Sequence, residues 1–387
     1  MCLISFRIKD DELCPCGSGS SFASCCKTRQ SKQVTSRKPP EVLIMEKMRS
    51  LVKRNSFCLH PDSSKCKGPI KKAHALQNNK IISLLAGADR HVYMLDSQRQ
   101  PLLLPMDDGS ILPFAQVEKI SANDATTQTC FCDFHDNVAF AAIEKGAPDF
   151  DSSNEEMKFV YAYKAFIFEY YKKLVGKMAY QESFKNNPEA FLDRNSVGLY
   201  RSQQLELKEF ERIKVYFDEQ ILSGTHDGVY TQVVKIPKQI KFACFAYIAP
   251  NYDLNGRRIN HTVKGVMHRI AITAFPEKTC SWVLFSCLDD EKEYYSDFFS
   301  QLNSSPLNKI QFYLTMILPL FSENMVLSPE LWKKWDGTSQ FAYTHMANLF
   351  GPDALKLETT IAMALKNASR DKSGKAYSNP VKIDLFV

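Results

Sequence analysis

The sequence predicts an α+β protein in which a cysteine-rich N-terminal third precedes a mixed domain of long helices with an antiparallel sheet. Nine of the twelve cysteines lie before residue 133. Two stretches, 152–178 and 202–222, carry apolar residues at helical spacing. Four runs between residues 232 and 287 are rich in β-branched and aromatic residues and are separated by turn signals. A chain of 387 residues that is 44% hydrophobic can bury a sizeable core.

Composition divides the chain into five segments. Residues 1–26 form a small cysteine module, and residues 27–56 form a basic linker followed by an amphipathic helix. Residues 57–150 hold a second set of cysteines and histidines, and residues 151–370 form the α+β domain. Residues 371–387 are expected to be a flexible tail whose alternating apolar residues could add an edge strand.

The first module is defined by four cysteines around a tight Gly/Ser turn. It begins with Cys14-Pro15-Cys16-Gly17-Ser18-Gly19 and ends with Cys25-Cys26. Two pairs of thiolates can close a tetrahedral shell around one soft divalent ion, and zinc fits best. The alternative is four structural thiols or two disulfides. This stretch, with Phe22 in the spacer, resembles the SEC-C motif, a small zinc-binding module that is attached to many unrelated proteins. The resemblance implies a zinc ion and says little about a reaction.

The charge of the chain is concentrated near this module. Residues 27–80 contain 14 Lys and Arg against three acids, whereas the whole chain carries only +6. A basic segment beside metal-binding motifs is typical of a nucleic-acid contact. The alternative is a linker whose lysines are exposed to water and make it soluble without contacting nucleic acid. An amphipathic helix is expected over 41–55, with Ile44, Met45, Met48, Leu51 and Val52 on one face. The candidate nucleic-acid-binding residues are Lys53, Arg54, Lys67, Lys71 and Lys72.

A second set of metal-ligating residues lies between Phe57 and His135. Cys58 and Cys66 bracket a turn, and Cys132 and His135 have the spacing of a zinc knuckle that opens a helix over 137–144. This order suggests a treble-clef arrangement around a second zinc ion. The four expected ligands are Cys58, Cys66, Cys132 and His135, with His60 and Cys130 in reserve. The alternative is a reduced thiol cluster in a small core.

The segment Ile70-Lys71-Lys72-Ala73-His74 resembles the strand of HNH-type treble-clef nucleases that ends in a histidine, and Cys132 to Asn137 resembles their second knuckle. The resemblance implies that His74 is a general base, that Asp136 or Asn137 is the metal-side residue, and that Mg or Mn polarises the phosphate. The sequence departs from this pattern, because Ala73 stands where an acid or histidine is common. Only Asn123 is a loose candidate for the intermediate asparagine. A structural His74 is the alternative.

The remaining helices and strands are predicted from the spacing of apolar residues and from turn residues. Ser152 and Ser153 each precede a glutamate by three residues, which predicts a helix from about 152 to 178. A second helix over 202–222 should turn Leu205, Phe210 and Ile213 inward. Short strands are expected over 91–95 and 109–112. The four strands of the sheet are predicted at 232–236, 241–249, 268–275 and 281–287, and later helices at 294–302, 307–321, 328–335 and 353–367.

These observations favour a cytoplasmic bacterial protein with two zinc ions whose basic N-terminal third contacts DNA or RNA. The alternatives are a metal-dependent HNH-like endonuclease and a zinc-module adaptor that binds a protein partner. The pattern also resembles bacterial proteins that couple an HNH-like half to a mixed helical and sheet half, which implies a context such as anti-phage defence. No apolar run predicts a membrane partner, no signal peptide is evident, and no phosphate-binding glycine loop is present.

Overall fold

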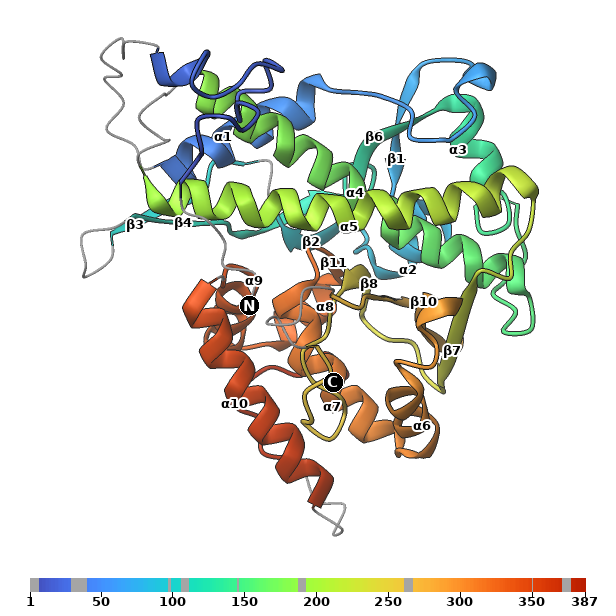
Figure 1. The fold of residues 1–387 in the computed structure, drawn as a ribbon. Helices are drawn as coiled ribbons and strands as arrows, with labels where there is room; N and C mark the ends of the chain where they lie inside the picture. The colour runs from blue at the N-terminus through green and yellow to red at the C-terminus, as the bar shows by residue number, and fades with distance from the viewer. Residues whose placement is uncertain are drawn as a thin grey trace.

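The protein is described by a computed structural model that covers residues 7–28, 40–96, 99–105, 111–144, 146–186, 193–260, 267–349, 351–370 and 377–387. It is an α+β fold built on one seven-stranded sheet (Figure 1). The strands are ordered β5-β2-β11-β8-β9-β10-β7, and every neighbouring pair is antiparallel. The predicted α+β class with an antiparallel sheet is therefore confirmed.

The strands of this sheet come from both halves of the chain. The N-terminal pair is β2 (His91–Leu95) and β5 (Val117–Ser121), and the rest are β7 (Val229–Ile236), β8 (Phe242–Ile248), β9 (Ile270–Pro276), β10 (Ser281–Leu288) and β11 (Asn324–Leu327). Two smaller antiparallel sheets pair β1 (Ile70–His74) with β6 (Thr127–Cys132), and β3 (Leu102–Pro105) with β4 (Ile111–Phe114). The main sheet thus joins strands on either side of residue 150.

Helices cover both faces of the sheet (Figure 1). One face carries α1 (Pro40–Arg54), α4 (Glu155–Asn186) and α5 (Arg194–Ser223), with α2 (Ser83–Leu85) and α3 (Asp133–Ala139) nearby. The other carries α6 (Ser296–Ser304), α7 (Leu307–Phe321), α8 (Pro329–Lys334), α9 (Gly337–Ala347) and α10 (Gly351–Arg370). Short helical turns are η1 (Cys26–Thr28), η2 (Ser63–Lys65), η3 (Asn78–Ile82) and η5 (Asp289–Glu291).

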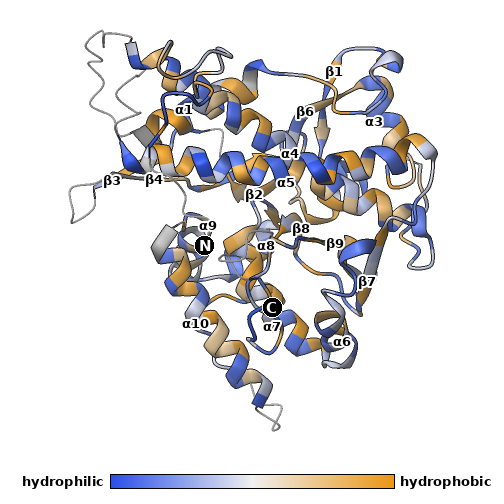
Figure 2. Ribbon diagram, in the orientation of Figure 1, coloured by the Kyte–Doolittle hydropathy of each residue, from blue (hydrophilic) through white to orange (hydrophobic). Residues whose placement is uncertain are grey.

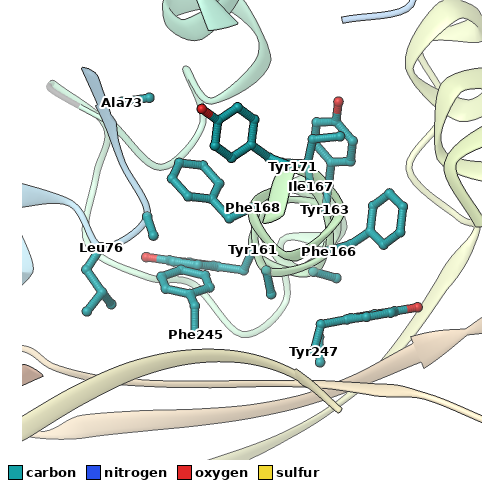
Figure 3. Packing of buried hydrophobic residues seen from close by; sticks show 14 of the residues in the cluster. Ala73, Leu76, Tyr161, Tyr163, Phe166, Ile167, Phe168, Tyr171, Phe245 and Tyr247 are labelled. Atoms are coloured by element: carbon teal, nitrogen blue, oxygen red, sulfur yellow. The ribbon is translucent and has the colours of Figure 1, made fainter. Parts of the chain in front are cut away.

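The alternation of side chains along a strand explains the two cores. In β8, Phe245 and Tyr247 face the core under α4, whereas Phe242, Cys244 and Ile248 face the core under α7. Both faces are covered, so all seven residues of β8 are buried. Figure 3 shows how aromatic side chains of α4 pack against Phe245 and Tyr247. Figure 2 shows hydrophobic and hydrophilic residues mixed on α10, as expected of a helix with one face on a core.

Several local predictions are wrong, each for a physical reason. Helix α4 is capped by Asn154, whose Oδ1 accepts the backbone N–H of Met157 at 3.0 Å, and not by Ser152 or Ser153. Leu205 is 48% exposed and does not face the core, because the inner stripe of α5 runs through Leu207, Phe210 and Ile213.

Two further differences concern element ends. The helix expected over 137–144 is α3, which ends at Ala139. Residues 381–387 form no strand. Val381, Ile383 and Leu385 are buried without pairing in a sheet, because the tail packs into the core beside α8 and α9. The backbone carbonyls of the tail accept hydrogen bonds from the side chains of Trp335 and Ser339. Of the tail expected to be flexible over 371–387, residues 371–376 lie outside the described residues.

Candidate metal centres

The first centre is a compact turn held by backbone hydrogen bonds. The N–H of Cys14 donates to the carbonyl of Ser20 at 2.8 Å, and Leu13 bridges to Ser21. Gly17 and Gly19 have φ of +79° and +78°, a region that glycine adopts without steric cost. The Gly-Ser-Gly sequence therefore lets the chain reverse and bring Cys14 and Cys16 toward the second cysteine pair.

The sulfur positions fit a tetrahedral metal ion. The Sγ atoms of Cys14, Cys16, Cys25 and Cys26 all lie within 4.8 Å of one another. Cys25 Sγ lies 3.6 Å from that of Cys16 and 3.9 Å from that of Cys26. Tetrahedral Zn–S bonds of about 2.3 Å would place two sulfurs about 3.8 Å apart. The disulfide alternative does not fit, since all four cysteines are free.

One thiol of this centre is poised to ionise. Burial raises the pKa of Cys16, but hydrogen bonds from Ser18 and Cys14 outweigh it and lower the pKa to about 6. Burial raises the pKa of Cys14 and Cys26. Ser18 Oγ also donates to Cys25 Sγ at 3.2 Å. A divalent cation would hold the buried thiols as thiolates, since soft metals bind the deprotonated form.

The first module is docked on the end of the α4–α5 pair. Cys14 and Cys26 pack with Phe184 of α4, which is 1% exposed, and with Tyr200 of α5. Arg201 forms an ion pair with Glu12 and donates to the carbonyl of Arg7 at 3.2 Å. The packing of the module against both helices makes it part of the folded body.

The second centre brings together residues far apart in sequence. The Sγ atoms of Cys58, Cys66 and Cys132 lie 3.3, 3.5 and 3.3 Å from Nδ1 of His135. Tetrahedral zinc with three thiolates and an imidazole would place sulfur and nitrogen about 3.6 Å apart. Burial raises the pKa of Cys132, but backbone N–H groups of His135 and Lys67 outweigh it and lower the pKa. Both candidate centres fit zinc.

Local structure explains why these four ligands converge. Strand β1 pairs with β6, with Ile70 opposite Cys132, and α3 begins directly after Cys132. The N–H groups of Asp133 and Phe134 donate to the carbonyls of Pro69 and Lys67 at 2.9 and 3.2 Å. These bonds fix the turn after Cys66 against the start of α3. His135 then lies in the first turn of α3 and is 1% exposed.

The two reserve residues lie outside this ligand group. His60 stacks on the ring of His135, with centroids 3.8 Å apart and planes 6° apart, and its Nδ1 accepts the N–H of Asp62 at 3.1 Å. Burial and the neighbouring His135 lower the pKa of His60 to about 4. Cys130 is fully buried and is not among the gathered ligand atoms. His60 therefore supports a ligand ring without contributing a ligand atom.

The three predicted catalytic residues have different surroundings. His74 ends β1, and its Nδ1 lies 3.0 Å from the carbonyl of Ala125; burial lowers the pKa of His74. Burial raises the pKa of Asp136, which Lys164 partly offsets. Asn137 donates from its amide to the carbonyl and carboxylate of Asp133 at 2.7 and 3.3 Å. Asn137 is thus engaged within its own helix.

A buried ion pair beside His74 and Asp136 was not predicted from the sequence. Lys164 of α4 is 1% exposed, forms an ion pair with Glu144 and lies 4.6 Å from the centroid of the Phe140 ring. Its charge acts on both His74 and Asp136. The available signal was a lysine inside the aromatic run between Tyr163 and Phe166. Within the described residues, His74, Asp136 and Glu144 do not gather as a metal-binding group.

Some of the predicted nucleic-acid-binding residues are already paired with acidic side chains, and others are exposed. Lys71 and Lys72 form ion pairs with Asp133 and Asp124, the second at 3.5 Å. Arg54 and Lys67 are exposed and make no ion pair within the described part of the chain, and Lys67 lies 5.7 Å from the Phe134 ring centroid. The side chain of Lys53 lies outside the described residues.

No protein-family model, no curated protein and no solved structure matches this chain. Among the described helices, none combines the length and the apolar character that crossing a bilayer requires.

Proposed function

We propose that this protein holds two structural zinc ions and uses the surface around the second centre to contact nucleic acid. The observation that carries the proposal is the turn from Cys58 to Cys66, where the exposed basic residues Lys65 and Lys67 flank the ligand Cys66. Zinc with four protein ligands has no open position, so it would act as a cross-link that holds this turn in place. The likeness to SEC-C and HNH-type modules supports the same assignment.

The charge around the second centre favours a phosphate backbone as the partner. Arg54 and Lys67 are exposed and make no ion pair among the described residues, while Lys71 and Lys72 keep part of their exposed surface despite their acidic partners. Lysine and arginine on such a surface bind phosphates and release counterions, so the affinity must fall as salt rises. Three such contacts would cost about 40-fold in affinity when salt rises about fourfold.

The test is binding of labelled DNA and RNA, single- and double-stranded, over a range of salt. Lys67→Glu and Arg54→Glu should weaken binding at low salt. Lys333→Glu is the matched control, since Lys333 is exposed on α8, across the sheet from the second centre, and the change in net charge is the same. Absence of binding to either polymer, or equal weakening by Lys333→Glu, contradicts the proposal and leaves the protein-binding adaptor.

A second candidate function, HNH-like phosphodiester hydrolysis, is favoured by the geometry of His74. A neutral imidazole whose Nδ1–H donates to the Ala125 carbonyl leaves Nε2 free to accept a proton from water. Magnesium commonly keeps several waters and takes only one or two carboxylates, so Asp136 with phosphate oxygens could suffice. The water oxygen would attack phosphorus while His74 takes one water proton. The P–O bond to the departing sugar oxygen would break, and solvent would protonate that oxygen.

Cleavage of plasmid with Mg or Mn tests this candidate. His74→Ala should abolish cleavage, whereas His91→Ala should retain it, because His91 begins strand β2 in the main sheet and its Nδ1 lies 2.6 Å from the carbonyl of Asp89. No cleavage by the wild type, or equal cleavage by the wild type and His74→Ala, rules out hydrolysis at this site.

A further inference from the structure

The outer face of α5 carries aliphatic side chains that the described part of the chain leaves uncovered. Figure 1 shows α5 crossing the front of the molecule, with α4 behind it. The inner residues of α5 pack into the core that α4 shares with the main sheet. On the outer face, Leu205, Val215 and Leu222 are 48%, 57% and 62% exposed. A single exposed aliphatic residue needs no explanation, but a row of them along one helix indicates a contact surface.

These three residues belong to one regularly spaced stripe. Between them lie Lys208, Arg212 and Glu219, which are also exposed. Leu205, Lys208, Arg212, Val215, Glu219 and Leu222 follow one another at intervals of three or four residues, the spacing of a coiled-coil seam. At about 100° per residue, they fall in one sector about 100° wide and extend along about 26 Å of helix. We call these six residues the α5 seam.

The charged residues of the α5 seam are available to a second molecule. Lys208 and Glu219 make no ion pair among the described residues. Arg212 lies 3.8 Å from the carboxylate of Glu291 and is still exposed. The acidic residues that flank the seam are paired within the chain: Glu209 with Arg269, and Asp218 with Lys214. These flanking acids therefore do not neutralise Lys208.

The α5 seam is complementary to itself when a second copy runs antiparallel to it. A two-fold axis midway between Arg212 and Val215 places each residue of one copy opposite a different residue of the other. The opposed pairs are Leu205 with Leu222, Lys208 with Glu219, and Arg212 with Val215. Symmetry repeats each pair, so leucines meet at both ends and both Lys–Glu pairs join opposite charges. The aliphatic stem of arginine can cover a valine while its charged end stays in water.

A parallel arrangement of two copies does not have this complementarity. Residues of a parallel, in-register pair face their own equivalents, so Lys208 would meet Lys208 and Glu219 would meet Glu219. Like charges placed opposite each other across an interface cost several kcal/mol. The charge order along the seam therefore favours the antiparallel arrangement.

We propose that this protein forms a symmetric dimer in which the α5 seams of two copies pack antiparallel. The second copy is the occupant that fits, because the same six residues supply both sides of the contact. An α-helix drifts by about 20° per heptad relative to a strict seam, so the helices would cross at the shallow angle of a coiled coil. One helix pair is a small interface, so the dimer should dissociate on dilution. This inference does not depend on nucleic-acid binding.

The experiment is sedimentation equilibrium of the full-length protein over a range of concentrations. Lys208→Glu and Glu219→Lys each place two like-charged pairs in the dimer, so each should weaken dimerisation at least about tenfold. The double variant Lys208→Glu/Glu219→Lys exchanges the two charges and should restore the wild-type affinity. Lys333→Glu is the matched control, since Lys333 is exposed on α8 and lies outside the seam. It should leave the affinity unchanged.

Mixing the two single variants tests the register directly. One pair of the mixed dimer is that of the wild type and the other is the exchanged pair, so the mixture should dimerise where each variant alone does not. A wild type that stays monomeric at every concentration overturns the inference. A dimer that both single variants retain, or that the double variant fails to restore, overturns it as well, because the contact would then lie elsewhere or in another register.

Discussion

Gly68 shows how one residue holds the second centre. It has φ of +76°, and a Cβ atom there would lie 2.9 Å from Cβ of Asp133 at the start of α3. Real Cβ atoms do not approach so closely, so any larger side chain must move α3 away from Cys66. The position thus couples the turn after Cys66 to the helix that carries His135.

We expect Gly68→Ala to destabilise the protein by more than about 2 kcal/mol and to reduce metal content at the second centre. Gly146→Ala is the matched control, since Gly146 has φ of +87° but no atom of the described residues, its chain neighbours aside, lies within 4 Å of the added Cβ. That variant should lose only about 1–2 kcal/mol, from the backbone conformation alone. Urea unfolding and elemental analysis measure both quantities, and equal losses in the two variants would contradict the steric argument.

Glu291 in η5 predicts a pH effect on stability. It is 6% exposed; burial and Asp290 raise its pKa to about 7, and Arg212, 3.8 Å away, partly opposes this. His268 lies 3.5 Å from the same carboxylate, which also accepts the backbone N–H of Arg269. Because the folded state binds the proton more tightly, the contribution to stability is complete below about pH 4.5 and is lost as the pH rises through about 7.

Glu291→Gln should therefore gain stability relative to the wild type by about 3 kcal/mol between pH 4.5 and pH 8. The difference between the two unfolding curves reports Glu291 together with its interaction with His268, which lies 3.5 Å from the carboxylate. Glu293→Gln, at an exposed glutamate two residues on, controls for the loss of a charge. A difference that does not change with pH would show that Glu291 is ionised throughout this range in the folded protein.

At the scale of elements, the start of α4 was predicted one turn too early. Both serines stand at capping-box spacing, yet Ser153 donates from its backbone and hydroxyl to Asp151, which leaves Asn154 to cap the helix. Asn154→Ala should cost about 1 kcal/mol of stability, and Ser152→Ala should cost nearly nothing. Chemical denaturation distinguishes the two variants. A larger loss of stability in Ser152→Ala would mean that Ser152, and not Asn154, caps the helix.

At the scale of the molecule, the two centres are embedded differently. The first packs in a small cluster of its own with Phe184, whereas Cys58 packs against the large core beside α4. Loss of the first ion should therefore release the module and leave the main body folded. Loss of the second should weaken the body itself, because β1, β6 and α3 share that core.

Elemental analysis and thermal unfolding test this difference. The wild type should hold two zinc ions, and Cys14→Ser and Cys58→Ser should each lose one. The melting temperature should fall by several degrees only for Cys58→Ser. Cys130→Ser is the control, since Cys130 is buried beside the second centre but outside its ligand group. Loss of an ion from Cys130→Ser, or a wild type free of metal, contradicts the assignment.

The elements that the sequence predicts well are those set by neighbouring residues. Strands β7 to β10 and helix α7 lie within a few residues of their predicted bounds. The spacing of apolar residues and the presence of turn residues predict them, because both depend only on residues close together in the sequence. Strand β11 and helix α9 were missed. Asn324–Leu327 is too short to show a period, and it becomes a strand only because it fits between β2 and β8.

The sequence by itself determined the ligand chemistry: cysteines at close spacing, glycines that permit the turns, and a knuckle that opens a helix. Only the tertiary structure decided that Cys58 lies beside His135, 77 residues away, that Lys164 forms an ion pair with Glu144, and which residues of α5 stay exposed. The reason is physical. Backbone preferences depend on adjacent atoms, whereas contacts between distant segments depend on how whole helices and strands pack, which no local pattern encodes.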